Sequence, residues 1–267
     1  MLHMILGKRK HTLTPLQQAH SASANVHILD TAFPIPQLGR TRRIWIYLPA
    51  GYATARERYP VLYMHDGQNL FDEQTSFSGE WGVDEMLDSM KANCIVVGID
   101  NGGVKRMTEY NPHDHPQQGK GEGKAYLEFV VKTLKPFIDK RYRTLKSKES
   151  TAIAGSSMGG LISMYAGLYY PTIFGSVGVL SPAFWAVPQL KTEVIQMAKR
   201  KYAGQRYFFY AGGGESNTMV TDMLQIAEWM DQHTKTTVEI LVLNEGQHNE
   251  QSWGRVFPQF YRWAISK

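Results

Sequence analysis

The sequence is poor in cysteine, has no long apolar run and carries no large excess of charge of one sign. Its single cysteine, Cys94, excludes an internal disulfide and a zinc site built from several thiolates. No apolar stretch approaches the ~20 residues of a membrane-spanning helix. The formal charge of +5 is a small balance of 29 basic and 24 acidic residues, and it does not indicate a nucleic-acid partner.

The N-terminus also lacks the order of a secretory signal. An apolar patch at residues 4–6 precedes the basic cluster at residues 8–10, whereas a signal places charge first and then roughly 7–15 apolar residues. We therefore expect a cytoplasmic protein.

The composition is that of a globular chain. Of the 267 residues, 43% are hydrophobic and 20% are charged, values that exclude a disordered or collagen-like protein. Residues 1–24 are polar and aperiodic, and we expect them to form a loose N-terminal arm. Residues 25–267 contain no repeat, linker or low-complexity segment, which predicts a single domain.

Strand-like segments recur along that domain. The first two, Val26–Leu29 and Arg43–Leu48, are typical of half-exposed antiparallel strands at a sheet edge. From Pro60 onward, short continuous apolar runs predict strands buried on both faces. These runs are Val61–Met64, Cys94–Ile99, Thr151–Ala154, Ser176–Leu180, Tyr207–Ala211 and Val238–Leu243.

Helix-like stretches separate the strands. They are Val83–Lys91, Gly123–Lys140, Gly160–Tyr169, Gln189–Tyr202, Thr218–His233 and Gln251–Ile265. The alternation predicts an α/β fold with a mostly parallel, doubly wound sheet and antiparallel N-terminal edge strands. In such a sheet, functional residues gather just after the carboxyl ends of the strands.

One of these strand ends carries a G-x-S-x-G motif. Gly155–Gly159 follows a predicted strand and precedes a predicted helix, and it is the single match in the chain. In that context the central serine, Ser157, is the expected nucleophile on a sharp turn whose glycines avoid a Cβ clash. Ser156 is a weaker candidate because it lacks symmetric glycines. A plain glycine-rich turn is the alternative interpretation.

A serine nucleophile needs a base, and histidine has a suitable pKa of ~6.5. Of the nine histidines, His248 lies in a glycine-containing loop between the last predicted strand and the last predicted helix. This is the expected position of the base in the chain order serine, acid, histidine. The alternative is a solvated loop histidine.

The base in turn needs a carboxylate that orients it. Glu215 follows the predicted strand Tyr207–Ala211 and three glycines, and we favour it. It has an alternative interpretation as a carboxylate that complements the dipole of the next helix. Asp222, Glu245 and Glu250 remain alternative acids.

Ester chemistry also needs donors for an oxyanion. The main-chain N–H of Met158, directly after the nucleophile, is one candidate. The second is the main-chain N–H of Gln68, in the loop after Val61–Met64, where Gly67 would allow close approach.

Three tryptophans are candidates for lining a substrate pocket, namely Trp81, Trp185 and Trp253. A buried core tryptophan is the alternative for each. Arg106 and Glu109 are candidates for shaping the mouth of the pocket, but a surface ion pair is the favoured interpretation. No metal-ligand spacing occurs, and no G-x-G-x-x-G follows a strand, so the sequence predicts no cofactor and no metal.

Together these motifs resemble the esterase family of α/β-hydrolases, which includes enterochelin esterases and feruloyl esterases. The segments that carry the resemblance are Tyr59–Asn69, Glu80–Asp84, Val97–Asn101, Glu109–Pro112, Ala154–Gly160, Leu180–Pro182 and Gly246–His248. The resemblance implies the α/β-hydrolase fold, a nucleophilic Ser157, a basic His248 and an oxyanion hole at Gln68 and Met158. Many relatives carry Asp at the acid position, so Glu215 matches less closely.

The predicted function is a serine carboxylic ester hydrolase that acts on small or soluble esters through a Ser-His-acid triad and an acyl-enzyme. The predicted partner is a small-molecule ester, with no nucleic acid and no membrane. Two alternatives remain. One is acyl transfer to an alcohol, and the other is an inactive hydrolase fold that binds a ligand or protein.

Overall fold

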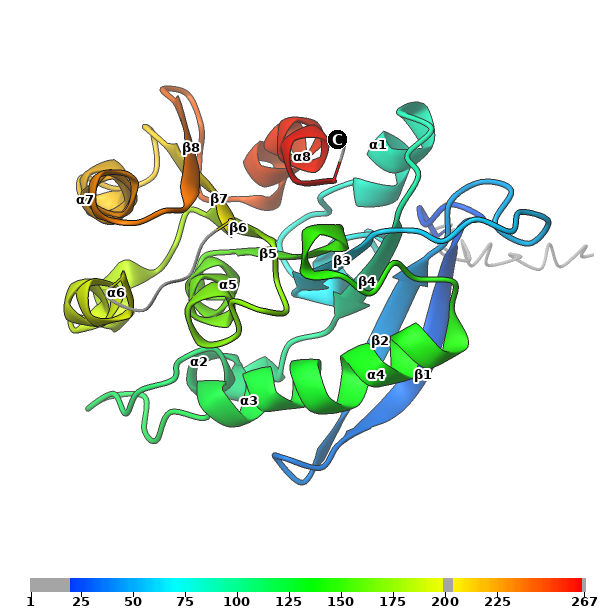
Figure 1. Cartoon of the computed structure of the whole chain (residues 1–267), viewed down its shortest axis with the longest axis horizontal. Coiled ribbons are helices and arrows are strands. Elements are labelled where there is room, and N and C mark those ends of the chain that lie inside the picture. Colours follow the sequence, from blue (N-terminus) through cyan, green and yellow to red (C-terminus); the bar gives the residue numbers. More distant parts are fainter. Residues whose placement is uncertain (1–19, 199–203, 266–267) are drawn as a thin grey trace, which may run out of the picture.

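The computed structural model describes residues 20–198 and 204–265. One mixed sheet crosses the middle of the molecule, and helices cover both of its faces (Figure 1). The strand order is β1-β2-β4-β3-β5-β6-β7-β8. The strands are β1 (Val26–Ile35), β2 (Arg40–Tyr47), β3 (Val61–His65), β4 (Ile95–Ile99), β5 (Thr151–Ser156), β6 (Ser176–Leu180), β7 (Arg206–Gly212) and β8 (Thr237–Leu243).

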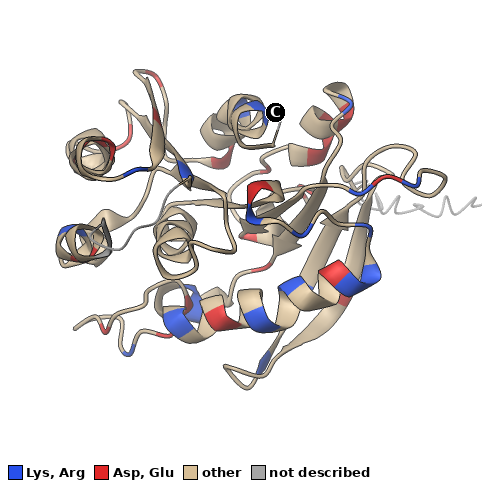
Figure 2. Cartoon of the chain, viewed as in Figure 1, with Lys and Arg blue, Asp and Glu red and all other residues tan. Residues whose placement is uncertain are grey.

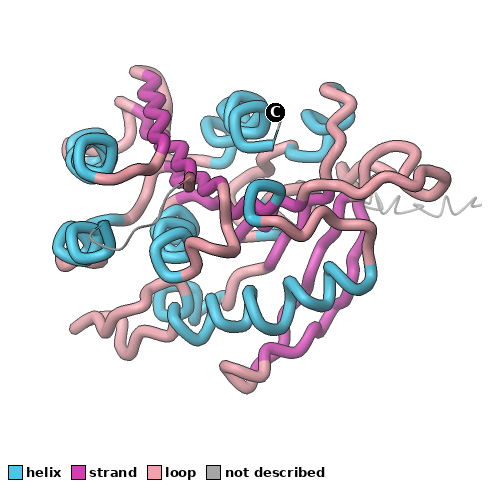
Figure 3. The backbone as a smooth tube through the Cα atoms, viewed as in Figure 1, coloured by secondary structure: helices cyan, strands magenta, loops and turns pink. Residues whose placement is uncertain are grey.

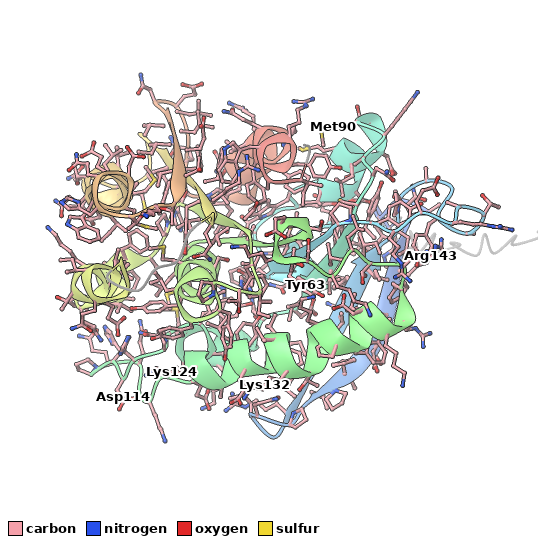
Figure 4. All side chains as sticks on the ribbon, in the orientation of Figure 1. Tyr63, Met90, Asp114, Lys124, Lys132 and Arg143 are labelled. Atoms are coloured by element: carbon pink, nitrogen blue, oxygen red, sulfur yellow. The ribbon has the colours of Figure 1, made fainter. Side chains whose placement is uncertain are left out.

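The predicted sheet is confirmed, except that Ile44–Tyr47 of β2 are all buried and not half-exposed, because β2 lies between β1 and β4. Strands β3 to β8 pair in parallel, whereas β1 and β2 are antiparallel at one edge. All residues of β3, β4, β5 and β6 are buried, as expected for strands with a helix layer on each face. Tyr63 of β3 lies between the two layers (Figure 4).

Strand β1 is longer than the sequence pattern predicts. Its pairing with β2 shifts register between Ile28 and Asp30 and again between Asp30 and Phe33. Each shift breaks the apolar alternation, so the pattern ends early although the strand continues. Residues 1–19 of the predicted arm lie outside the described residues, as do residues 199–202 of the predicted helix Gln189–Tyr202.

Two helix layers bury the sheet (Figure 3). One contains α1 (Val83–Ser89) and α8 (Glu250–Ile265), which pack on the apolar side chains of one sheet face. The opposite face has its own apolar core. Its helices are α3 (Gly123–Phe129), α4 (Lys135–Arg141), α5 (Met158–Tyr169), α6 (Leu190–Ala198) and α7 (Met219–His233), with the short α2 (Arg106–Glu109) at the end of this layer.

The outer face of α3 and α4 carries charges of both signs (Figure 2). Lys132 pairs with Glu128, and Lys135 pairs with Asp139, both at helical spacing. A π-helical turn over Val130–Leu134 joins the two helices. The Lys132–Glu128 pair is exposed, whereas the Lys135–Asp139 pair is largely buried.

Candidate active site

A cavity of about 960 Å³ opens above the carboxyl ends of the central strands. This is where an open α/β sheet concentrates its functional loops, because parallel strands end on the same edge. The residues that line it are Arg43, Asp66, Gln68, Asn69, Thr75, Ser76, Phe77, Ser78, Asp100, Asn101, Gly103, Val104, Arg106, Ser156, Ser157, His248, Asn249, Glu250 and Trp253.

Ser157 joins β5 to α5 by a sharp turn. Its φ is 58° and its ψ is −122°, a conformation that a residue with a side chain rarely adopts. A Cβ at Gly155 would lie 2.8 Å from the main-chain carbon of Gly159, so glycine is required where the strand and the helix meet. The strained turn projects Ser157 into the cavity, as the motif predicts.

His248 contacts Glu215 directly. The Nδ1 atom of His248 lies 2.7 Å from Oε2 of Glu215, whose side chain is 1% exposed, whereas the histidine side chain is 39% exposed. The loops that carry the two residues touch at glycines, since a Cβ at Gly212 would lie 2.3 Å from the main chain of Gly246. Among the described carboxylates, Glu215 is therefore the one bonded to His248, and the alternative acid Asp222 is not.

The loop after β3 approaches the cavity from the other side. It forms a single 3₁₀ turn, Gly67–Asn69, and Gln68 lines the cavity. A Cβ at Gly67 would lie 2.7 Å from the main-chain nitrogen of Ile99, which explains the glycine. Main-chain N–H of Asn101 donates to Oε1 of Gln68 at 3.1 Å and ties this loop to the end of β4. Met158 is buried at the first position of α5.

The interpretation of Arg106 and Glu109 as a surface ion pair is wrong. Arg106 lines the cavity and binds Asp66 through two hydrogen bonds, of 2.7 and 2.9 Å. Glu109 is fully buried and pairs with Arg40 and Arg42 of the edge hairpin. Sequence proximity suggested the wrong partners, because β2 brings two arginines to the same place.

Asp66 holds an unusual buried charge. Burial by itself raises its pKa, but the charge and hydrogen bonds of Arg106, with a further bond of 2.7 Å from Asn101 Nδ2, outweigh that effect and lower the pKa below its ordinary value. Its backbone is left-handed, with φ 56°. The signal that the sequence analysis overlooked was an aspartate directly after a buried strand.

The three tryptophans occupy different environments. Trp253 lines the cavity, and its ring stands edge-on to His248 with centroids 5.0 Å apart. The ring of Trp81 packs against that of Trp253, with centroids 5.7 Å apart, and Trp81 is not among the lining residues. Trp185 also lies outside the lining and is 58% exposed.

Two of the alternative acids have other surroundings. Glu250 lines the cavity and accepts a hydrogen bond of 3.0 Å from Asn69 Nδ2, and burial raises its pKa. Glu245 lies in the exposed loop before His248. Neither is the carboxylate at Nδ1 of His248 in the described structure.

Three carboxylates gather outside the cavity lining, where the chain enters α1. Oxygen atoms of Glu80, Asp84 and Glu85 lie within 4.8 Å of one another. Burial raises the pKa of Asp84 to about 7, so this carboxyl holds a proton over much of the acidic range. Ser21 Oγ donates to Glu80 and Ser23 N–H to Asp84. The cluster is therefore tied to the N-terminal segment rather than to the cavity.

Comparisons with known proteins identify relatives of this chain. The chain is 29% identical to the uncharacterized protein YbbA of Bacillus subtilis over 203 residues, which cover 73% of this chain and 78% of that protein. It is 31% identical to the iron(III) enterobactin esterase of Escherichia coli K12 over 152 residues, covering 56% of this chain but 34% of the esterase.

A crystal structure of an IroE-like serine hydrolase from Shewanella oneidensis superimposes with a TM-score of 0.70 at 23% identity, covering 84% of this chain and 75% of the other. That likeness confirms the α/β-hydrolase fold. Among the described helices, none combines the length and apolarity that crossing a bilayer requires.

The Esterase family model, described as "Putative esterase", matches residues 35–263. The match covers most of the chain, including every segment that carries the resemblance found in the sequence. It confirms the predicted enzyme class, a carboxylic ester hydrolase, at the level of the family. The chain therefore belongs to the Esterase family of α/β-hydrolases.

Proposed function

We propose that the protein is a serine carboxylic ester hydrolase in which Ser157, His248 and Glu215 form the catalytic triad. The observation that carries the proposal is the bond of 2.7 Å between the buried Glu215 carboxylate and Nδ1 of His248. The imidazole shares its cavity with Ser157 on the strained turn. This combination of nucleophile, base and orienting acid is what acyl transfer through serine requires.

In the first half of the reaction, Ser157 Oγ attacks the ester carbonyl while Nε2 of His248 accepts the serine proton. The bond to the alcohol then breaks, and the alcohol leaves with the proton from His248, so an acyl-enzyme remains. In the second half, water attacks the acyl carbon and His248 accepts its proton. The carboxylic acid departs as Ser157 regains a proton, while Glu215 stays ionised and holds the Nδ1–H tautomer of the base.

Two main-chain N–H groups are proposed to stabilise the oxyanion. Met158 occupies the first position of α5, where the N–H has no partner within the helix and the helix dipole favours negative charge. Gln68 faces the same cavity from the β3 loop. Loss of one such donor typically lowers turnover by ~10²–10³.

We propose a small or soluble ester as the substrate class. Most of the residues that line the cavity of about 960 Å³ are polar, which suits a soluble ester, and two apolar side chains at its lining, Phe77 and Val104, are almost fully exposed. An apolar acyl or alcohol group would cover them on binding. One relative is named as an esterase of a small molecule, iron(III) enterobactin, and this supports a small ester as the substrate class.

The test combines a covalent probe with turnover. We expect a fluorophosphonate to add one adduct to the wild type, seen as a single mass increase, and p-nitrophenyl acetate and butyrate to be hydrolysed. Ser157→Ala should lose the adduct and lower kcat by about 10⁴-fold or more. Ser156→Ala is the matched control and should keep the adduct. A folded wild type that is neither labelled nor active would refute the triad.

A further inference from the structure

Ser181, directly after β6, is a second buried serine with strained backbone beside the nucleophile. Its φ is 43°, and it is fully buried. Of the four non-glycine residues with positive φ in the described chain, three directly follow the neighbouring strands β3, β5 and β6, namely Asp66, Ser157 and Ser181. Such strain persists where surrounding contacts enforce it, and it often marks a functional constraint.

The side chain of Ser181 holds the carboxylate of Glu215. Its Oγ donates to Oε1 of Glu215 at 2.6 Å and accepts a hydrogen bond of 2.9 Å from Nε1 of Trp253. The N–H of Gly212 donates to the same Oε1 at 2.6 Å, while Oε2 faces His248. Both carboxylate oxygens are thus occupied, and rotation of the carboxylate would break bonds to buried groups.

The backbone around Ser181 also holds the nucleophile. Ser157 N–H donates to the carbonyl oxygen of Leu180 at 2.9 Å, and the N–H of Ala183 donates to the carbonyl oxygen of Ser157 at 3.1 Å. On the other side, Ser181 N–H donates to the carbonyl oxygen of Tyr210 on β7 at 2.6 Å. One short segment therefore connects the nucleophile's turn with the strand that leads to the acid.

We propose that Ser181 is a positioning residue for the esterase reaction. Its hydroxyl, oriented by Trp253, fixes the Glu215 carboxylate in the position that holds His248, and its backbone sets that assembly against Ser157. The inference rests on the proposed triad, and Ser181 itself neither contacts the substrate nor transfers a proton.

Ser181→Gly is the informative substitution. Glycine adopts positive φ without a Cβ penalty, so the variant removes the hydroxyl without adding backbone strain. We expect kcat for p-nitrophenyl acetate to fall about 10- to 100-fold, with KM within about twofold and a melting temperature lowered by a few degrees, because the buried Nε1–H of Trp253 loses its acceptor. Trp253→Phe keeps a ring beside His248 but removes the donor to Ser181, and it should lower kcat about 3- to 10-fold.

Ser176→Ala is the matched control. Ser176 is a buried serine at the start of the same strand, and its Oγ donates to the carbonyl oxygen of Ala264, away from the cavity. This variant should keep the wild-type kcat. The fluorophosphonate gives a second measurement, because Ser181→Gly should still be labelled completely but at a rate reduced by the same factor as kcat.

Wild-type kcat and labelling rate in folded Ser181→Gly would overturn the inference. If Ser181→Gly has a strongly lowered melting temperature, Trp253→Phe gives the test instead, because it leaves the strained backbone in place. A wild-type kcat in Trp253→Phe would then overturn the inference. The failure of the triad looks different. In that case the wild type itself is unlabelled and inactive, whereas failure of this inference leaves Ser157→Ala inactive and Ser181→Gly fully active.

Discussion

The two sides of the cavity are built by different means. On the proposed acid–base side, formed by Ser157, Ser181, Glu215 and His248, strained turns set the backbone, and two uncharged donors, the Ser181 hydroxyl and the N–H of Gly212, hold the Glu215 carboxylate. On the proposed oxyanion side, formed by Asp66, Gln68, Asn101 and Arg106, the β3 loop is held by Arg106 of α2 and by the main-chain N–H and side-chain amide of Asn101, which follows β4.

This difference predicts different responses to substitution. The N–H of Gly212 still donates when a neighbouring side chain is changed, and no charge is left without a partner, so variants on the acid–base side should lose much activity but little stability. A buried ion pair behaves in the opposite way, because removal of one partner leaves a charge without compensation. Variants on the oxyanion side should therefore lose stability first.

The largest expected effect is that of Glu215→Gln. The amide has the same shape, but its NH₂ group can face Nδ1 of His248 and stabilise the wrong tautomer of the base. We expect kcat to fall about 10³- to 10⁴-fold, with a melting temperature within a few degrees of the wild type. Ester hydrolysis and a thermal melt on the same sample measure both quantities.

Two other carboxylates serve as controls for that prediction. Asp222→Asn and Glu245→Gln alter the alternative acids of the sequence analysis, and both should keep the wild-type kcat. Near-wild-type activity in Glu215→Gln, together with a large loss in either control, would show that another residue is the acid of the triad.

An intermediate effect is expected for Arg106→Ala on the oxyanion side. The variant leaves the Asp66 carboxylate buried without its counter-ion and should lower the free energy of unfolding by about 3–5 kcal/mol at pH 7. Because Arg106 lowers the pKa of Asp66, the pair stabilises the fold above about pH 4 and loses that contribution as pH falls through the lowered pKa. In urea unfolding, the difference in the free energy of unfolding between the variant and the wild type should be smaller at pH 3.5 than at pH 7.

Arg43→Ala is the control for this ion pair. Arg43 lines the same cavity and pairs with Asp100 at 2.7 Å, but its side chain is 30% exposed. The loss there should be about 1 kcal/mol or less. Equal losses in the two variants would remove the distinction between the two sides of the cavity.

A pH-dependent loss of stability is expected at His65, the last residue of β3 and the neighbour of Asp66. Burial lowers the pKa of His65 to about 4, so the folded protein excludes a proton that the unfolded chain binds below pH ~6.5. Stability that is present above pH ~6.5 is therefore lost as pH falls toward 4. His65→Asn should flatten this decline by about 3 kcal/mol or less in denaturant titrations. Parallel pH profiles of the wild type and the variant would contradict the prediction.

Local sequence patterns predicted much of this fold. The parallel strands were predicted because continuous apolar runs suit burial on both faces, and Ser157 because its turn needs glycines at fixed spacing. The choice of Glu215 over Asp222 followed from position after a strand. The extent of β1 was not predicted, since register shifts interrupt its alternation.

By itself the sequence determined the sheet, the family and the glycine-flanked turn at Ser157, because these depend on periodicity and on short, contiguous steric requirements. Only the tertiary structure decided which charges meet. Arg106 binds Asp66, 40 residues away, and Ser181 reaches Glu215 across 34 residues. Such pairs depend on which strands become neighbours and where each one ends, and contacts between distant segments leave no local pattern in a single chain.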